Sequence, residues 1–473
     1  MTLEWTSMSQ LRHGIRGVLG KDREDNLAVL NRTALRYQLI DRLVYTAVLS
    51  RDAGLREGCR WLIREAARVM GIFPASIYEL YKAMGQGRCG GFTVPAINAR
   101  GLPYDEARAL FRVAHRLEAW PFILEVARSE IGYLQQPPAE YAAAVLGAAI
   151  LEGFQGPVFL QGDHFQVNRA SFQQQPQAER EALHSLIAEA VEAGFFNIDI
   201  DASTLVDFSR PSLEAQQEPN FTVTAELTGV IRRRQPPGIT ISVGAEIGEI
   251  GRQNSTVEDL DAFMTGYRRC IEGQNISPGI SKISIQTGTK HGGVVLPDGT
   301  IARVQLDFDT LQQLSQVARE RYSMAGAVQH GASTLPDELF HRFRELGTAE
   351  IHLATGFHNA IYDSPHFPPE LRDEIYAYLH QTYGSSKSPE ETDAQFLYRE
   401  RKQAFGPFKE KLWHMPEARR QRIGQELEAK FTFIFTQLGM GHTREAVRKY
   451  IKPVAVPIPM PAALKEVWQG VEA

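Results

Sequence analysis

Three histidines of this chain stand at or just beyond the ends of short apolar segments, where parallel strands would bring them together. His164 closes PVFLQGDH, His291 follows ISKISIQTG, and His330 lies in AGAVQHGAS. Imidazole nitrogens bind zinc and related divalent metals, and three of them leave a fourth position open for a substrate carbonyl. One such histidine alone would more often be structural, so the prediction of a metal site depends on the three sharing one edge of a sheet.

Carboxylates accompany these histidines. Asp163 precedes His164, and Glu246 and Glu249 end the segment ITISVGAEIG. Successive side chains of a strand point to opposite faces, so Asp163 and His164 can share a site only if the backbone turns there. A carboxylate beside a divalent cation can accept or donate a proton at the reacting carbon or hydroxyl. The alternative for Asp163 is a helix N-cap.

The last three apolar segments end in glycine and hydroxyl residues. Exposed backbone N–H groups bind phosphate, and the loops after strands 7 and 8 are the usual phosphate site of a parallel barrel. Ordinary turn glycines are the alternative. The residues concerned are Gly292, Gly293, Gly331, Ser333, Thr355 and Gly356.

The elements that must position these residues alternate along the middle of the chain. Apolar runs span 92–98, 121–127, 157–164, 196–203, 239–248, 280–288, 325–333 and 350–356, and amphipathic helical segments such as 104–119, 177–195, 257–271 and 306–321 lie between them. About eight strand–helix repeats indicate parallel strands with right-handed crossovers, and their natural closed form is a (β/α)8 TIM barrel. An open doubly wound sheet is the alternative, but no GxGxxG follows the first strand.

Helical extensions flank this barrel in our prediction. We expect a helical N-terminal extension over 1–71, the barrel over 72–364 and a helical C-terminal extension over 365–473. Apolar residues at helical spacing in 27–49 and 418–439 support the two extensions. The C-terminal one could serve oligomerisation or cover the barrel mouth.

Composition narrows the class of protein. The 473 residues are 43% hydrophobic and 23% charged with a net charge of −5, which is ordinary for a globular enzyme. The charge argues against a nucleic-acid or membrane-surface binder. Three separated cysteines, without a CxxC pair, suggest neither a disulfide framework nor a cysteine zinc site. Without a long apolar run or a signal-peptide core, we expect a cytoplasmic protein with no membrane partner.

The ordered motifs resemble those of a known family. GFTVPAIN, GDH, GFFNIDIDAS, GAEIGEIG, GTKHGG, LDFDTL, QHGAS and IHLATG are similar to those of the class II, zinc-dependent ketose-bisphosphate aldolases. That family cleaves fructose or tagatose 1,6-bisphosphate through a metal-stabilised enediolate. The resemblance implies that His164, His291 and His330 bind Zn²⁺ or another divalent transition metal, that Glu246 lies near it, and that Asp163 moves a proton. It also implies a homo-oligomer and, in some members, a monovalent cation.

The resemblance also implies a site for a small sugar phosphate. Its substrate- or phosphate-binding residues would be Asn98, Gly292, Gly331, Ser333, His352 and Thr355. His352 stands where the family has an asparagine, and a phosphate-binding serine of the family falls at Ala127, beside Arg128. Glu125 stands where a glutamine is common.

The most serious departure concerns the base. The loop glutamate that abstracts a proton in the family falls at Asn254, which cannot act as a base. Glu249, Glu258 and Asp259 are the alternatives nearby.

Three functions stay open on the sequence. The three histidines favour a metal-dependent aldolase that cleaves or forms a ketose (bis)phosphate. A metal-dependent epimerase or isomerase of a phosphorylated or acidic sugar would use the same polarised carbonyl. The missing loop acid favours a non-catalytic, aldolase-like partner subunit, which GDHFQVN and IDIDAS also resemble.

Overall fold

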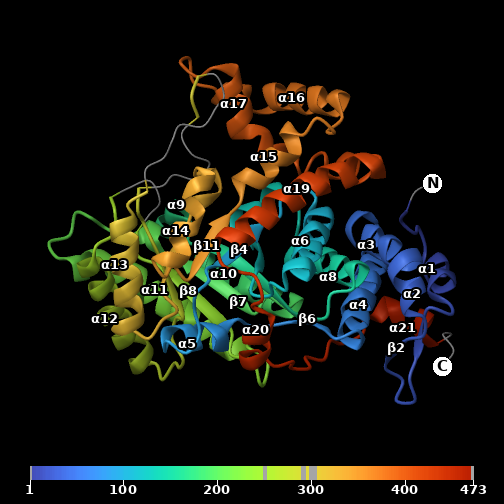
Figure 1. The fold of residues 1–473 in the computed structure, drawn as a ribbon, viewed down its shortest axis with the longest axis horizontal. Coiled ribbons are helices and arrows are strands. Elements are labelled where there is room, and N and C mark those ends of the chain that lie inside the picture. Colours follow the sequence, from blue (N-terminus) through green and yellow to red (C-terminus); the bar gives the residue numbers. More distant parts are fainter. Residues whose placement is uncertain (1–2, 249–252, 289–294, 298–305, 470–473) are drawn as a thin grey trace.

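Eight parallel strands form a closed barrel at the centre of the protein in the computed structural model, which describes residues 3–248, 253–288, 295–297 and 306–469 (Figure 1). The strands are β4 (Val94–Asn98), β5 (Ile123–Ala127), β6 (Gly156–Gln166), β7 (Asn197–Asp201), β8 (Ser242–Glu246), β9 (Lys282–Ile285), β10 (Ala327–Gln329) and β11 (Glu350–Leu353). They pair in the order β6-β5-β4-β11-β10-β9-β8-β7, and β6 also pairs with β7, which closes the ring. The predicted (β/α)8 barrel is confirmed.

Burial on both faces explains why the strands appear in the sequence as near-continuous apolar runs. Every residue of β4, β5 and β7 to β11 is buried, because helices cover the outside and side chains fill the interior. A short strand, β3 (Ile72–Pro74), pairs in parallel with the start of β6 outside this ring.

Helices on the outside connect the barrel strands. Helices α6 (Pro103–Leu117), α8 (Pro138–Glu152) and α10 (Pro176–Ala193) begin with a proline. Proline is favourable in the first turn, because a backbone N–H at that position has no hydrogen-bond partner within the helix. Gly153 and Gly194, with φ of 72° and 97°, end α8 and α10 in the left-handed conformation. The helices are α5 (Tyr78–Gly85), α6 (Pro103–Leu117), α7 (Arg128–Tyr133), α8 (Pro138–Glu152), α9 (Arg169–Gln174), α10 (Pro176–Ala193), α11 (Leu213–Arg234), α12 (Val257–Gly273), α13 (Phe308–Glu320), α14 (Phe340–Glu345) and α15 (Thr355–Asp363).

The N-terminal region is not helical throughout. Strands β1 (Leu19–Lys21) and β2 (Leu27–Val29) form an antiparallel hairpin. The apolar spacing of 27–49 predicted a helix that would include β2. The Asp22 carboxylate accepts hydrogen bonds from the backbone N–H groups of Glu24 and Asn26, which stabilises the turn. One helix, α1 (Met8–Ile15), precedes the hairpin. Helical structure resumes after the Asn31 cap with α2 (Arg32–Ala34), a π-helical turn over 35–39, α3 (Ile40–Leu49) and α4 (Ala53–Val69).

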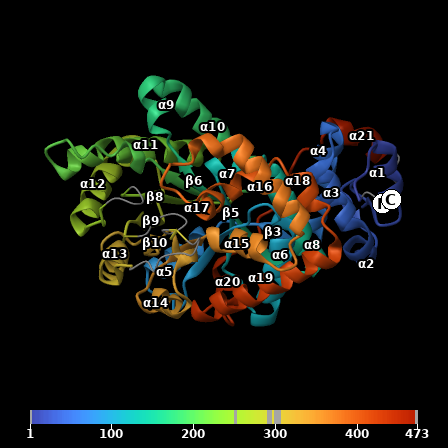
Figure 2. The same cartoon turned by 90° about the horizontal axis from the view of Figure 1, so that it is seen from above.

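The C-terminal region lies over the barrel mouth and along one side. Its helices are α16 (Pro369–Tyr383), α17 (Asp393–Glu400), α18 (Lys409–Trp413), α19 (Glu417–Gln437), α20 (Arg444–Tyr450) and α21 (Ala462–Gln469), with a 3-10 turn, η6 (Arg401–Ala404), after α17. Figures 1 and 2 place α17 above the strand ends, while α19 packs against α6 and α15. The last helix, α21, returns to pack against α1 and α4.

None of the helices in the described part of the chain is long and apolar enough to cross a membrane. The domain boundaries at residues 71 and 364 stay a prediction.

Candidate active site

A bulge in β6 brings Asp163 and His164 to the same side of the strand. The register against β7 shifts between Gly162 and Phe165, so that Asp163 and His164 together oppose Asp199. His164 has a φ of 39°, a left-handed conformation uncommon for any residue other than glycine. Bulges of this kind occur next to active sites, where they redirect a side chain. The backbone turn that a shared site requires is therefore present, although β6 continues to Gln166 instead of ending at His164.

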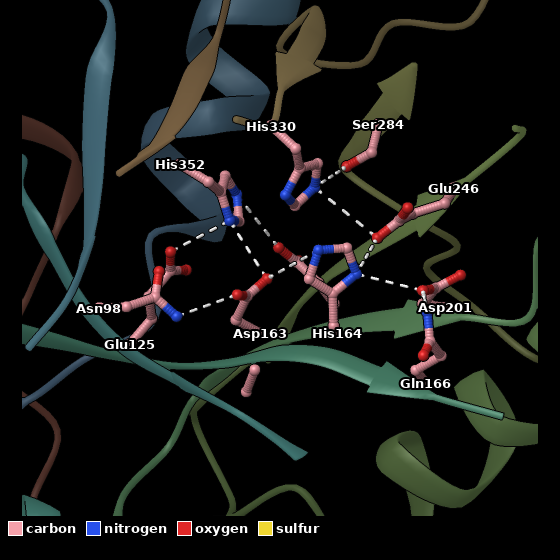
Figure 3. Close-up of polar contacts among 12 residues, drawn as sticks. Asn98, Glu125, Asp163, His164, Gln166, Asp201, Glu246, Ser284, His330 and His352 are labelled. Carbon is pink, nitrogen blue, oxygen red and sulfur yellow. Dashed lines mark hydrogen bonds and ion pairs between the residues drawn. The ribbon is translucent and has the colours of Figure 1, made fainter. Parts of the chain in front are cut away.

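Three metal-type donor atoms converge from β6, β8 and β10 (Figure 3). Nδ1 of His164 lies 2.7 Å from Oε1 of Glu246, and Nε2 of His330 lies 3.6 Å from the same oxygen. The two imidazole centroids are 4.3 Å apart, and the donors all lie within 4.8 Å of one another. His291, the third predicted histidine ligand, and Gly292 beside it lie outside the described residues.

These residues fit a divalent metal. In a tetrahedral zinc site with bonds of about 2.0 Å, neighbouring ligand atoms are about 3.3 Å apart, close to the spacing here. Oε1 of Glu246 is buried and lies between the two imidazoles, 2.7 Å from His164 and 3.6 Å from His330. Two imidazoles and a carboxylate form the mixed nitrogen and oxygen set that zinc accepts in catalytic sites.

The electrostatics of this cluster also favour a positive charge. Burial lowers the pKa of His164, but Glu246 and Asp163 outweigh burial and raise that pKa well above its ordinary value. Burial and the nearby Asp201 raise the pKa of Glu246 to about 7. Asp201 lies 3.1 Å from the same Nδ1 of His164 and also accepts a hydrogen bond from Ser203, so two carboxylates lie beside this nitrogen.

Asp163 is held as a carboxylate at the edge of the metal-type cluster. Asn98 donates a hydrogen bond of 3.1 Å to Oδ2 of Asp163, and Nδ1 of His352 lies 3.2 Å from Oδ1. Burial would raise the pKa of Asp163, but His164 and His352 lower it well below the ordinary value. The side chain is therefore a fixed, ionised proton acceptor, and it does not serve as a helix cap.

His352 belongs to a network of charged side chains inside the barrel. Its Nδ1 lies 3.1 Å from Oε1 of Glu125, and its Nε2 lies 2.6 Å from Oε1 of Glu350. The ammonium of Lys282 donates to Glu350 at 2.5 Å and to Asp199 at 2.8 Å. Burial and Asp163 raise the pKa of Glu125 to about 8. Sequence reasoning missed this network, although Lys282 and Glu350 are charged residues within otherwise apolar strands.

One cavity of about 1110 Å³ collects most of the predicted site residues. Gly331, with a φ of 71°, begins the turn after β10, and the Ser333 hydroxyl accepts a hydrogen bond from the backbone N–H of Gly356. The N-terminus of α15 thus lies beside that turn, a geometry suited to an anion. The predicted residues that line the cavity are Asn98, Asp163, His164, His330, Gly331, Ser333, His352 and Thr355.

The two described alternatives to the loop base do not line this cavity. Asn254 donates a hydrogen bond to Asp307. Asp259 accepts from the hydroxyl and the N–H of Thr256, as the capping box of α12. Glu258 is exposed on the same helix, and Glu249 lies outside the described residues. Neither Asp259 nor Glu258 lines the cavity.

The geometry defines a parallel barrel whose strand ends hold a divalent-metal donor set beside an ionised carboxylate. The family model described as "Fructose-bisphosphate aldolase class-II" matches residues 79–407. This match covers most of the chain, and the chain belongs to that family.

One curated relative and two solved structures are similar to this chain. A protein of Coccidioides immitis (strain RS) named "Putative fructose-bisphosphate aldolase" is 27% identical over 275 residues, which cover 58% of this chain and 78% of the relative. The solved structure of fructuronate-tagaturonate epimerase UxaE from Cohnella laeviribosi matches 84% of this chain and 90% of its own with a TM-score of 0.57 and 10% identity. A solved structure described as a "probable tagatose 6 phosphate kinase" from Sinorhizobium meliloti 1021 matches 80% of this chain and 97% of its own, with a TM-score of 0.50 and 16% identity. At these identities the two structures show a shared fold.

Proposed function

We propose that this protein is a metal-dependent aldolase that cleaves or forms a ketose phosphate such as fructose or tagatose 1,6-bisphosphate. The observation that carries the proposal is the convergence of His164, Glu246 and His330 in a class II aldolase barrel, where both histidines line one cavity together with Asp163. A divalent metal held by these residues would polarise the substrate ketone as a Lewis acid.

Asp163 performs the proton transfer in this proposal. Because Asn98 and His352 hold it ionised, it accepts the proton of the C4 hydroxyl as the bond between C3 and C4 breaks. The hydroxyl carbon becomes the aldehyde of one product, and the electron pair of the broken bond passes to the ketone half. In the direction of condensation, Asp163 returns the proton to the new hydroxyl.

The turn after β10 and the start of α15 bind a phosphate of the substrate. Gly331, Ser333 and Thr355 line the cavity, and the N-terminus of α15 adds a favourable partial charge. A phosphate fixed there orients the ketone relative to Asp163.

The test is triose phosphate release from fructose 1,6-bisphosphate and tagatose 1,6-bisphosphate, measured with a coupled dehydrogenase on zinc-loaded protein. We expect release from at least one of the two. No release from either substrate would contradict an aldolase acting on them and would favour the non-catalytic partner subunit.

The second candidate is a metal-dependent epimerase of an acidic sugar. The observation that favours it is the C-terminal region, which contributes arginine and lysine to the cavity wall, together with the imidazole of His352 beside Asp163. Incubation with fructuronate, followed by NMR, would detect tagaturonate if this candidate is correct; no conversion would exclude this reaction.

A further inference from the structure

The segment that follows the barrel forms one wall of the active-site cavity. Its lining side chains include Ser386, Glu391, Gln395, Arg399 and Lys402, from the turn before α17 to η6. Figure 2 shows α17 in front of β5 and β6 when the molecule is seen from above, and these residues line the same cavity as Asp163 and His164 of β6. A substrate in the cavity therefore meets groups that the barrel itself does not supply.

Most cations of the cavity wall are already neutralised by a carboxylate. The three arginines bind neighbouring acids: Arg100 binds Glu130, Arg128 binds Glu179 and Arg399 binds Glu391. Arg100 also contacts Nδ1 of His358 at 3.0 Å. These pairs orient the wall and contribute little net charge.

Lys402 differs from these arginines. Among the described residues, no carboxylate lies within ion-pair distance of its ammonium, which stands 5.9 Å from the centre of the Tyr133 ring. Burial, followed by the charge of Arg100, lowers the pKa of Lys402. A half-buried cation without a bound acid attracts an anion from the solution.

The hydroxyl of Tyr133 points to the same conclusion. It is buried, and none of the residues that the structure describes gives it a hydrogen-bond partner. Burial raises the pKa of Tyr133, so the group is a hydrogen-bond donor at neutral pH. Tyr133 and Lys402 both line the cavity, so a hydroxyl and an ammonium are available there to a ligand oxygen.

We propose that Lys402 and Tyr133 together bind an anionic group of the substrate, a phosphate or a carboxylate, so that the C-terminal extension sets the substrate class. This inference rests on the proposed function, because it concerns the same cavity. It assigns the charged group to the end of the substrate near the loops that follow β4 and β5, whereas Ser333 and Thr355 serve the other end.

Binding of small charged and neutral probes to the full-length protein tests the proposal. Calorimetric titrations use glycerol 3-phosphate, glycerate and glycerol, in wild type and in a Ser333→Ala background that weakens the opposite phosphate site. We expect Lys402→Met to weaken binding of one anionic probe about tenfold, the effect of losing one charge-assisted hydrogen bond, and to leave glycerol unchanged. Tyr133→Phe weakens the same probe by a smaller factor, and Lys402→Arg retains most of the affinity.

Lys387→Met is the matched control, because Lys387 lies in the same segment but is bound to Asp393 at 3.0 Å. It should bind every probe as wild type does. The anionic probe whose affinity falls in Lys402→Met shows whether the site binds a phosphate or a carboxylate. Equal affinity of Lys402→Met and wild type for both anions, with the same urea midpoint, would overturn the proposal. The titrations need no turnover, so an inactive enzyme would contradict only the proposed function.

Discussion

Lys282 offers a stringent test of the charged network inside the barrel. Its side chain is 1% exposed, and its ammonium lies 2.5 Å from Glu350 and 2.8 Å from Asp199. Lys282→Met removes the cation and leaves these acids buried without it. Breaking a buried ion pair by removing one partner costs about 3–5 kcal/mol, because the remaining charge is left uncompensated.

The double variant Lys282→Met/Glu350→Gln separates this cause from a packing defect. It removes one buried charge of each sign, so we expect it to recover at least half of the stability lost in the single variant. Urea unfolding followed by circular dichroism at pH 7 measures both. The control Lys387→Met breaks an exposed pair and should cost about 1 kcal/mol or less.

The pH dependence follows from Glu350. Burial would raise its pKa, but Lys282 and His352 lower it to about 2. The ionised Glu350 carboxylate stabilises the folded state above the pKa of an unfolded glutamate, about 4.3, and this stabilisation is lost as pH falls through 2. The difference in the free energy of unfolding between wild type and Lys282→Met should therefore shrink below pH 4. A single variant as stable as wild type at pH 7, or a double variant no better than the single, would refute this reasoning.

Three further predictions concern the site and its support. Asp163→Asn should lower kcat for triose phosphate release by about 10²–10⁴ while the bound metal per chain stays unchanged; an unaltered kcat would remove Asp163 from the mechanism. Gly162→Ala should destabilise the chain by about 1–3 kcal/mol, because the new Cβ would lie 2.4 Å from the Phe165 ring; unchanged urea unfolding would argue against the bulge. Burial raises the pKa of Glu106 well above its ordinary value, so wild-type stability falls as pH rises above about 4.3, by about 1.4 kcal/mol per unit up to the folded pKa. Glu106→Gln should therefore be more stable than wild type at pH 7 and equal to it near pH 4, and a constant difference would contradict this.

The barrel could be predicted from the sequence because its signal is local and repeated. Each buried strand is a short apolar run, and each helix between them has its own apolar face. The hairpin at β1 and β2 could not be predicted in the same way. Its strands are only three residues each, and the apolar residues of β2 continue the helical spacing of the segment that follows.

The donor set could be predicted because strand ends of a parallel barrel meet at one face. His164 and His330 were expected together from that rule alone, whereas Glu246 was expected near the metal from the family resemblance. The role of Lys402 could not be predicted, because it depends on how the segment after the barrel folds back across the cavity. The bulge at Asp163 is an intermediate case: the shared site required a backbone turn, and the left-handed His164 supplies it.

The most direct test of metal-dependent aldol cleavage is a zinc titration of EDTA-stripped protein, followed by the initial rate of triose phosphate release from the better bisphosphate. We expect no rate in stripped protein and a rise that saturates at about one zinc per chain. A rate in stripped protein equal to that of the zinc-loaded protein, or none at any zinc concentration, would contradict it.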